Sequence, residues 1–169
     1  MKKAFYVSFI ALVVIGIGYA VWLPSERTAT KRIRFDLACT DIWDVYRDVE
    51  SQGDWRADIE TIEIVSATNP RAWIEHFEQG PDIKFTEISS AAGQNLRLAF
   101  EAEGFFTGSY NASFREDEKG CLGTFTETVY LESLWSKIMS YLFFDLEEAI
   151  DLYAESAASE ARNRSPQIP

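Results

Sequence analysis

Histidine and cysteine are scarce in this sequence, and their scarcity removes several kinds of site. The 169 residues include one histidine, His76, and two cysteines, Cys39 and Cys121, which are too few for a zinc cluster of histidine and cysteine. The sequence also lacks a Gly-x-Ser-x-Gly nucleophile elbow, a phosphate-binding loop and a Gly-x-Gly-x-x-Gly fingerprint. We therefore expect neither a bound metal nor a cofactor.

Basic residues are also few. There are 16 lysines and arginines against 27 aspartates and glutamates, and the formal net charge is −11. Such a surface repels phosphate, and no basic stripe with interleaved aromatic residues occurs, so a nucleic-acid partner is not expected. The same charge disfavours binding of the domain flat onto anionic lipid, so that the N-terminal segment would be the only membrane contact.

Charge is absent from residues 4–23, which read AFYVSFIALVVIGIGYAVWL. A run of this length matches what a helix needs to cross the hydrocarbon core of a bilayer. A cleaved signal peptide is one alternative, although its apolar region is usually about 7–15 residues long and the best cleavage motif, residues 18–20, lies inside the run. A buried core helix is another. We expect an uncleaved signal anchor, a transmembrane helix within residues 1–24.

The orientation of this anchor follows from the basic residues on either side of it. Lys2 and Lys3 favour a cytoplasmic N-terminus. Arg27 and the basic residues of 31–34 follow on the other side, but they are expected in a folded strand and count for less. We therefore expect a single-pass protein of a bacterial cytoplasmic (inner) membrane, with its domain facing the periplasm or the outside.

After the anchor, the sequence predicts strands and two short helices. Residues 31–39 alternate strictly and place Ile33, Phe35 and Cys39 on one face, which is typical of a half-buried strand. Thr40 is a plausible N-cap for a helix over residues 41–49, and a second short helical turn ends at residues 53–55. Six further strands are expected near residues 59–65, 71–77, 83–90, 96–100, 110–114 and 121–131, separated by turn residues as in an antiparallel meander.

A single long helix is predicted over residues 134–162, because apolar residues recur there at three- and four-residue steps without Pro or Gly. Trp135, Met139 and Phe143 widen the apolar stripe near its start. This helix should pack against the sheet, and residues 163–169 should form a disordered tail.

The order of strand, two short helices, six strands and long helix resembles the START-related, polyketide-cyclase-like superfamily called SRPBCC. The matching stretches are residues 33–49, Asp54-Trp55, the Trp73-x-Glu75 strand and residues 126–130. The resemblance implies an α+β helix-grip domain over residues 25–162, a curved seven-stranded antiparallel sheet wrapped around the long helix. Residues 131–134 depart from the pattern, because relatives often have an Asn-Pro turn there.

The resemblance also bears on the two cysteines. In a helix-grip sheet the first and last strands pair antiparallel, so Cys39, at the end of one, would face Cys121, at the start of the other. In an extracytoplasmic domain this implies a possible disulfide. The alternative is two small buried side chains that never meet.

Aromatic residues are the main functional signal, because they occur in nearly every predicted element. A helix-grip sheet that is not completely filled would use them to line a cavity for an apolar ligand; the alternative is a solid aromatic core. The expected ligand-binding residues are Trp43, Tyr46, Trp55, Trp73, Phe85, Phe100, Tyr110, Phe125, Trp135, Met139 and Phe143.

Two carboxylates could project into this interior. Glu75 shares a strand face with Trp73, and Glu127 shares one with Phe125. Burial would raise the pKa of either group and suit it to orient a polar ligand head or to act as an acid. The alternative for each is an exposed position or an internal partner. Asp145, within the apolar run of the long helix, raises the same question.

Three functions remain open from the sequence. The first is a membrane-anchored domain that binds or carries a hydrophobic small molecule, lipid-like or isoprenoid-like. The second, implied by the resemblance, is a cyclase or dehydrase that uses Glu75, Glu127 or Tyr110 as acid or base. The third is an interaction module of the cell envelope, with Phe105 and Phe106 on a contact loop. We favour a non-enzymatic binding domain, and the oligomeric state is left open.

Overall fold

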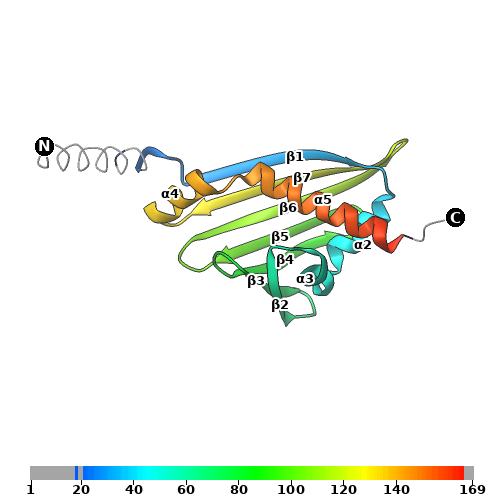
Figure 1. Ribbon diagram of the computed structural model, residues 1–169, viewed down its shortest axis with the longest axis horizontal. Helices are drawn as coiled ribbons and strands as arrows, with labels where there is room; N and C mark the ends of the chain where they lie inside the picture. The colour runs from blue at the N-terminus through cyan, green and yellow to red at the C-terminus, as the bar shows by residue number, and fades with distance from the viewer. Residues whose placement is uncertain (1–17, 19–20, 166–169) are drawn as a thin grey trace, which may run out of the picture.

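The computed structural model describes residue 18 and residues 21–165. Its seven strands form one antiparallel sheet in the order β1-β7-β6-β5-β4-β3-β2, curved around the helix α5 (Figure 1). This is the α+β arrangement that the sequence predicts. The strands are β1 (Glu26–Phe35), β2 (Ile59–Ser66), β3 (Ala72–Phe77), β4 (Ile83–Ala91), β5 (Asn95–Ala102), β6 (Phe106–Asp117) and β7 (Gly120–Leu131).

Most of the expected membrane anchor, residues 4–23, lies outside the described residues. Within the part that is described, none of the helices combines the length and the apolar character needed to cross a bilayer. The C-terminal helix continues to Arg164, two residues beyond its predicted end at Arg162, and residues 166–169 of the expected tail are again outside the description.

Strand β1 is displaced toward the N-terminus relative to the prediction. It begins at Glu26, opposite Tyr130, and ends at Phe35, opposite Cys121. Because β7 begins at Gly120, no partner strand remains for the residues after Phe35. Cys39 therefore belongs to a helix, α2 (Cys39–Arg47), rather than to the strand.

Helix α2 has Ala38, not the predicted Thr40, at its N-cap position. It is followed by η1 (Val49–Ser51) and α3 (Gln52–Trp55). Ile42 and Val45 are completely buried, which fits the apolar face expected for this segment. The helices close the end of the sheet where β1 stops (Figure 1).

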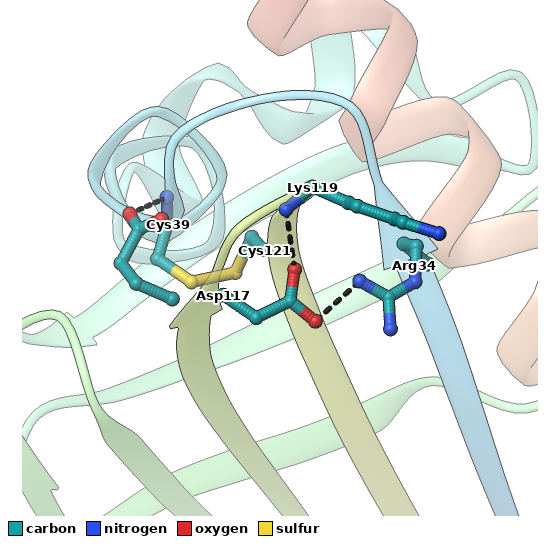
Figure 2. The surroundings of a disulfide bond; sticks show 6 residues. Arg34, Cys39, Asp117, Lys119 and Cys121 are labelled. Carbon is teal, nitrogen blue, oxygen red and sulfur yellow. Dashed lines mark hydrogen bonds and ion pairs between the residues drawn. A yellow bond between two sulfur atoms is a disulfide. The ribbon is translucent and has the colours of Figure 1, made fainter.

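The cysteines are joined by a disulfide across this end of the sheet. Figure 2 shows Cys39, at the start of α2, bonded to Cys121, at the start of β7. Their Cα atoms are 4.8 Å apart, and the sequence separation of the two cysteines is 82. Of the two alternatives for these residues, the structure contains the bonded one. Beside it, Asp117 pairs with Arg34 and accepts a hydrogen bond from the amide of Lys119.

The predicted single helix over residues 134–162 is wrong in one respect: the structure divides it into α4 (Leu134–Phe143) and α5 (Leu146–Arg164). Asp145 is the N-cap of α5, and its carboxylate accepts hydrogen bonds from the amides of Glu147 and Glu148. A side chain that binds the backbone in this way starts a new helix rather than continuing the old one. Asp145 is exposed and is therefore a capping residue, not an interior acid.

Helix α4 begins at the residues that depart from the family pattern. Ser133 is its N-cap and forms a capping box with Ser136, a strong local signal for a helix start. Helix α5 then crosses the concave face of the sheet. Its small residues Ala154, Ala157 and Ala158 are buried, and Lys31 of β1 forms an ion pair with Asp151 at 2.8 Å.

Candidate functional site

The candidate site is on the concave face of the sheet, where Tyr110 and Glu127 are neighbours. Tyr110 on β6 is paired in register with Glu127 on β7, and Glu127 is paired on its other side with Ala29 of β1. Glu127 lies on the same face as the buried residues Phe125 and Val129. Of the alternatives left open for Glu127 by the sequence, the structure therefore contains the inward one.

Glu127 is half-buried and has no ionic partner. Among the described residues, no group forms a hydrogen bond or salt bridge with its carboxylate, whereas the buried carboxylate of Glu75 is paired with Arg56. Burial raises the pKa of Glu127 from 4.5 to about 7. A carboxyl group with this pKa exchanges its proton near neutral pH, which suits it to donate or accept a proton or a hydrogen bond.

Three tyrosines from different elements meet one another, and one of them, Tyr110, is the register partner of Glu127. The ring of Tyr46 on α2 lies 4.9 Å from that of Tyr153 on α5, and the ring of Tyr110 lies 6.5 Å from that of Tyr153. The hydroxyl groups of Tyr46 and Tyr110 are buried and interact with each other, but neither forms a hydrogen bond of ordinary geometry with any described residue. Burial raises the pKa of both hydroxyls well above the ordinary value, so they remain neutral hydrogen-bond donors.

A third unpartnered donor lies beside them. The indole nitrogen of Trp55 is buried and likewise has no partner among the described residues, and its ring is 6.1 Å from that of Tyr153. Leaving one such group unsatisfied costs about 1–3 kcal/mol. Tyr46, Tyr110 and Trp55 belong to one aromatic cluster, and Tyr110 of this cluster lies across from the carboxyl of Glu127, which makes the Tyr110–Glu127 position the candidate for binding a polar group from outside the chain.

Glu75, the other predicted carboxylate, is buried but already paired. Its Oε2 accepts a hydrogen bond from Nη1 of Arg56 at 2.8 Å, and its Oε1 accepts one from Nε1 of Trp73 at 3.1 Å. Arg56 is further held by Gln52 and Asp58. Glu75 is therefore buried, but it has an internal partner in Arg56. It is less free than Glu127 to interact with a ligand.

The aromatic side chains of the concave face pack against one another. In one group, the ring of Trp73 stacks on that of Phe85 with centroids 5.4 Å apart, and the centroids of the Phe85 and Phe100 rings are 5.7 Å apart. In the other, Phe125 contacts Tyr46 at 5.7 Å and Tyr110 at 6.4 Å. The predicted binding residues that are buried or half-buried on this side are Trp43, Tyr46, Trp55, Trp73, Phe85, Phe100, Tyr110 and Phe125.

Three predicted binding residues lie elsewhere. Trp135, Met139 and Phe143 belong to α4 and are 60%, 37% and 73% exposed. They cannot form a wall of an interior pocket, because the break at Asp145 separates α4 from the part of the helix that covers the sheet. Of the two phenylalanines on the expected contact loop, Phe105 is exposed, but Phe106 is half-buried, with its ring 6.1 Å from that of Phe100.

Two surface hollows lie near the sheet, and neither is lined by the predicted binding residues. One, of about 290 Å³, lies between the β1 segment Glu26 to Ala29 and the break between α4 and α5. Ala29 in its wall is the register partner of Glu127. The other, of about 410 Å³, is lined by Ser, Thr and Asn side chains of β4 to β7 and by Arg97.

Two further residues contribute to the site. Tyr153 lies in the apolar stripe of the last helix, and a tyrosine in such a stripe carries a hydroxyl that needs a partner. Arg56 follows Trp55 in a short loop, and no local pattern distinguishes it from a surface arginine. Among the described residues, no group of three His, Cys, Asp or Glu side chains could hold a metal ion.

Comparison with known proteins identifies the fold. No family model matches the chain, and no curated protein sequence matches it. The structure is similar to the Zhui aromatase/cyclase from Streptomyces sp. R1128, with a TM-score of 0.70 at 12% identity, covering 84% of this chain and 97% of that one. It is also similar to norcoclaurine synthase from Thalictrum flavum, in complex with dopamine and hydroxybenzaldehyde, with a TM-score of 0.67 at 13% identity, covering 84% and 90%.

A further similar structure is an uncharacterised protein from Rhizobium leguminosarum, with a TM-score of 0.66 at 10% identity, covering 82% of this chain and 96% of that one. At these identities the likeness establishes the fold and nothing finer. The chain is a helix-grip protein, as the resemblance in its sequence implied.

Proposed function

We propose that this helix-grip domain binds a small, largely apolar molecule that carries a hydrogen-bonding group, and that this group is held by Glu127 and Tyr110. The observation that carries the proposal is the carboxyl of Glu127, unpaired among the described residues, directly across from Tyr110, whose hydroxyl is buried and forms no hydrogen bond of ordinary geometry there. The apolar part of the ligand lies against the aromatic side chains of the concave face, such as Phe125.

The ligand must also supply a hydrogen-bonding partner for the side chains of Tyr110 and Glu127. A carbonyl or hydroxyl oxygen accepts a hydrogen bond from Tyr110 and, at a pH below about 7, from the protonated carboxyl of Glu127. These two hydrogen bonds replace those that the buried groups lose on leaving water, which makes the binding selective for molecules with an oxygen in this place.

A second function, an enzyme of the cyclase or dehydrase type, is favoured by the same pair. Glu127, with a pKa of about 7, transfers a proton to or from a bound carbonyl compound, and the Tyr110 hydroxyl donates a hydrogen bond to the oxygen on which charge develops. The likeness to an aromatase/cyclase supports this alternative at the level of the fold.

The location proposed for the domain is the outer side of a bacterial cytoplasmic membrane, with residues 4–23 as its anchor. The uncharged run of these residues supports the anchor. The Cys39–Cys121 disulfide supports the orientation, because disulfides persist in oxidising compartments and are rare in the cytosol.

The ligand proposal is tested on the full chain purified in detergent. Solvent extraction and native mass spectrometry should find a co-purifying apolar molecule in the parent protein. The Glu127→Gln/Tyr110→Phe variant should retain much less of it, because both polar contacts are weakened while the side-chain volumes stay nearly constant. Glu118→Gln, in the exposed β6–β7 turn, is the matched control and should retain the parent amount.

Two results would overturn the binding proposal: no small molecule in the parent protein, or equal amounts in all three proteins. The enzymatic alternative is tested by a separate measurement. Incubation of the extracted molecule with fresh protein should then give a product that has lost water or closed a ring, at a rate that changes near pH 7, and Glu127→Gln should abolish that change.

A further inference from the structure

Helix α4 presents its apolar side chains away from the protein. Trp135, Met139, Leu142 and Phe143 follow one another at steps that place them on one face of a helix, and Trp135, Leu142 and Phe143 are 60%, 69% and 73% exposed. Phe144, which follows the helix, is 50% exposed. A surface helix normally turns its polar side chains to water and its apolar ones to the protein, and α4 has the opposite arrangement.

The polar side chains of α4 face the protein instead. Ser136 is buried and belongs to the capping box. Ser140 receives a hydrogen bond from Arg27 at 2.6 Å, and Lys137 and Tyr141 donate hydrogen bonds to the carbonyls of Leu23 and Pro24. The helix is therefore fixed in this orientation by polar contacts on one side, so its apolar face is held outward rather than left free to turn inward.

Those last two contacts place α4 at the end of the uncharged N-terminal run. Leu23 closes the run of residues 4–23, and Lys137 Nζ lies 3.2 Å from its carbonyl oxygen. Figure 1 shows α4 and the start of β1 at the same end of the molecule, opposite the end of α5. If the run crosses a bilayer, α4 is held at the bilayer surface.

The charge of α4 also differs from that of the rest of the chain. The protein has a formal net charge of −11, yet residues 134–144 contain no acidic residue and one lysine, Lys137. An interfacial helix has this composition: Trp, Leu and Phe on the buried face and no negative charge to be repelled by anionic lipid. With ten residues, α4 is too short to cross a bilayer.

We propose that α4 is a second membrane contact, which lies in the surface of the same bilayer that residues 4–23 cross, with Trp135, Met139, Leu142 and Phe143 among the lipid headgroups. This inference rests on the proposed anchor and goes beyond it. It also replaces the expectation that the anchor is the only membrane contact, because the negative charge behind that expectation is absent from α4. The consequence is a fixed orientation of the domain, with the break between α4 and α5, and the hollow beside it, close to the membrane.

A bilayer is a better occupant of this face than the chain's own N-terminal run. Val21 and Trp22, the last side chains of that run before Leu23, are 60% and 88% exposed, so they do not cover α4. The polar contacts from α4 to Leu23 and Pro24 are to the backbone, and they leave the apolar face of the helix open.

The test uses the full chain with a single added cysteine, because Cys39 and Cys121 are bonded to each other. Leu142→Cys on α4 and Leu152→Cys on α5 are matched, since both leucines are exposed on helices, at 69% and 58%. Each is labelled with the fluorophore NBD and reconstituted into vesicles of phosphatidylcholine and phosphatidylglycerol, with and without lipid-attached doxyl quencher.

We expect the label at position 142 to shift its emission to shorter wavelength and to lose intensity with the quencher, while the label at position 152 does neither. Emission typical of water at both positions would overturn the inference. An emission shift at position 142 without quenching would overturn it too, because it would mean that protein rather than lipid covers this face of α4. Flotation of the same vesicles tests the anchor separately: a protein that floats with a water-exposed label at 142 refutes only the role of α4, whereas one that stays behind refutes the anchor and this inference with it.

Discussion

Arg27 on β1 and Ser140 on α4 are 113 residues apart in sequence and joined by two hydrogen bonds. Nη1 of Arg27 lies 2.6 Å from both the backbone carbonyl and the hydroxyl oxygen of Ser140, and it also donates to the carbonyl of Phe144 at 3.0 Å. The carbonyls at the end of a helix lack partners within the helix. Arg27 therefore satisfies the end of α4 at the place where the chain turns toward α5.

We predict that Arg27→Ala loosens α4 while leaving the rest of the fold intact. The lost hydrogen bonds come from a charged group that is partly exposed, so the local stability of α4 should fall by about 1–2 kcal/mol. This corresponds to amide exchange in α4 that is roughly 5–30 times faster. Hydrogen exchange with mass spectrometry measures it. Arg32→Ala, on the exposed face of the same strand, should leave the exchange of α4 unchanged, and equal effects of the two variants would contradict the prediction.

The buried pair of Arg56 and Glu75 gives a second prediction. Their side chains are 10% and 5% exposed, so Arg56→Leu leaves the Glu75 carboxylate buried with only the hydrogen bond from Trp73. Breaking a buried pair in this way typically costs about 3–5 kcal/mol of unfolding free energy. Urea denaturation at neutral pH measures the loss.

The matched control for that pair is Lys84→Leu. Lys84 pairs with Glu101 on the outer face of the sheet, where the two side chains are 46% and 55% exposed. A surface pair of this kind is worth about 0–1 kcal/mol, so the control should unfold close to the parent midpoint. Comparable losses in the two variants would show that burial of the Arg56 pair has no special consequence.

Glu127 should make stability depend on pH with a definite sign. Burial raises its pKa from 4.5 to about 7 in the folded protein, so the folded state binds the proton more tightly than the unfolded state. Between these two values unfolding releases a proton, and the unfolding free energy falls as pH rises. The change is at most about 3 kcal/mol, and it is complete above pH 7.

Glu127→Gln removes this dependence. The variant should match the parent near pH 4.5 and exceed it in stability at pH 8, because the parent then contains a half-buried carboxylate without a partner. Denaturation series across this pH range give the difference in unfolding free energy between the two proteins at each pH. The Glu118→Gln control should show the same dependence of unfolding free energy on pH as the parent. A constant difference for Glu127→Gln would mean that the carboxyl group titrates as it does in water.

Reduction of the Cys39–Cys121 disulfide should destabilise the domain. The bond closes a loop of 82 residues in sequence, and a crosslink over so long a loop removes much of the entropy of the unfolded chain. The usual cost of losing such a bond is about 2–4 kcal/mol. Urea denaturation with and without reductant measures it. The Cys39→Ala/Cys121→Ala variant should match the reduced protein, and an unchanged midpoint in both would contradict a stabilising role.

Local sequence patterns predicted the strands and their faces. Strict alternation places Phe125, Glu127 and Val129 on one face of β7, and the structure has them there. This succeeds because the side-chain period of a strand is set by backbone geometry, so the alternation alone separates the two faces. The aromatic residues on the strands were placed inside for the same reason.

The last helix shows where such patterns fail. Apolar residues at helical spacing continue through Asp145, and this periodicity predicts one helix. A capping aspartate and a helical aspartate look alike in sequence, so the break was visible only as a polar residue in an apolar run. Arg27, more than a hundred residues away, binds carbonyls at the end of α4, a contact that no local pattern encodes.

The sequence by itself determined the order of strands and helices and the face of each strand, because strand alternation and element order are local properties; the resemblance in that order implied the helix-grip arrangement. Only the tertiary structure decided which groups meet. Tyr46, Tyr110 and Tyr153 come from three separate elements, and their approach to one another depends on the packing of α2 and α5 on the sheet. The outward apolar face of α4 depends equally on polar contacts with β1 and with Leu23, which no local pattern encodes.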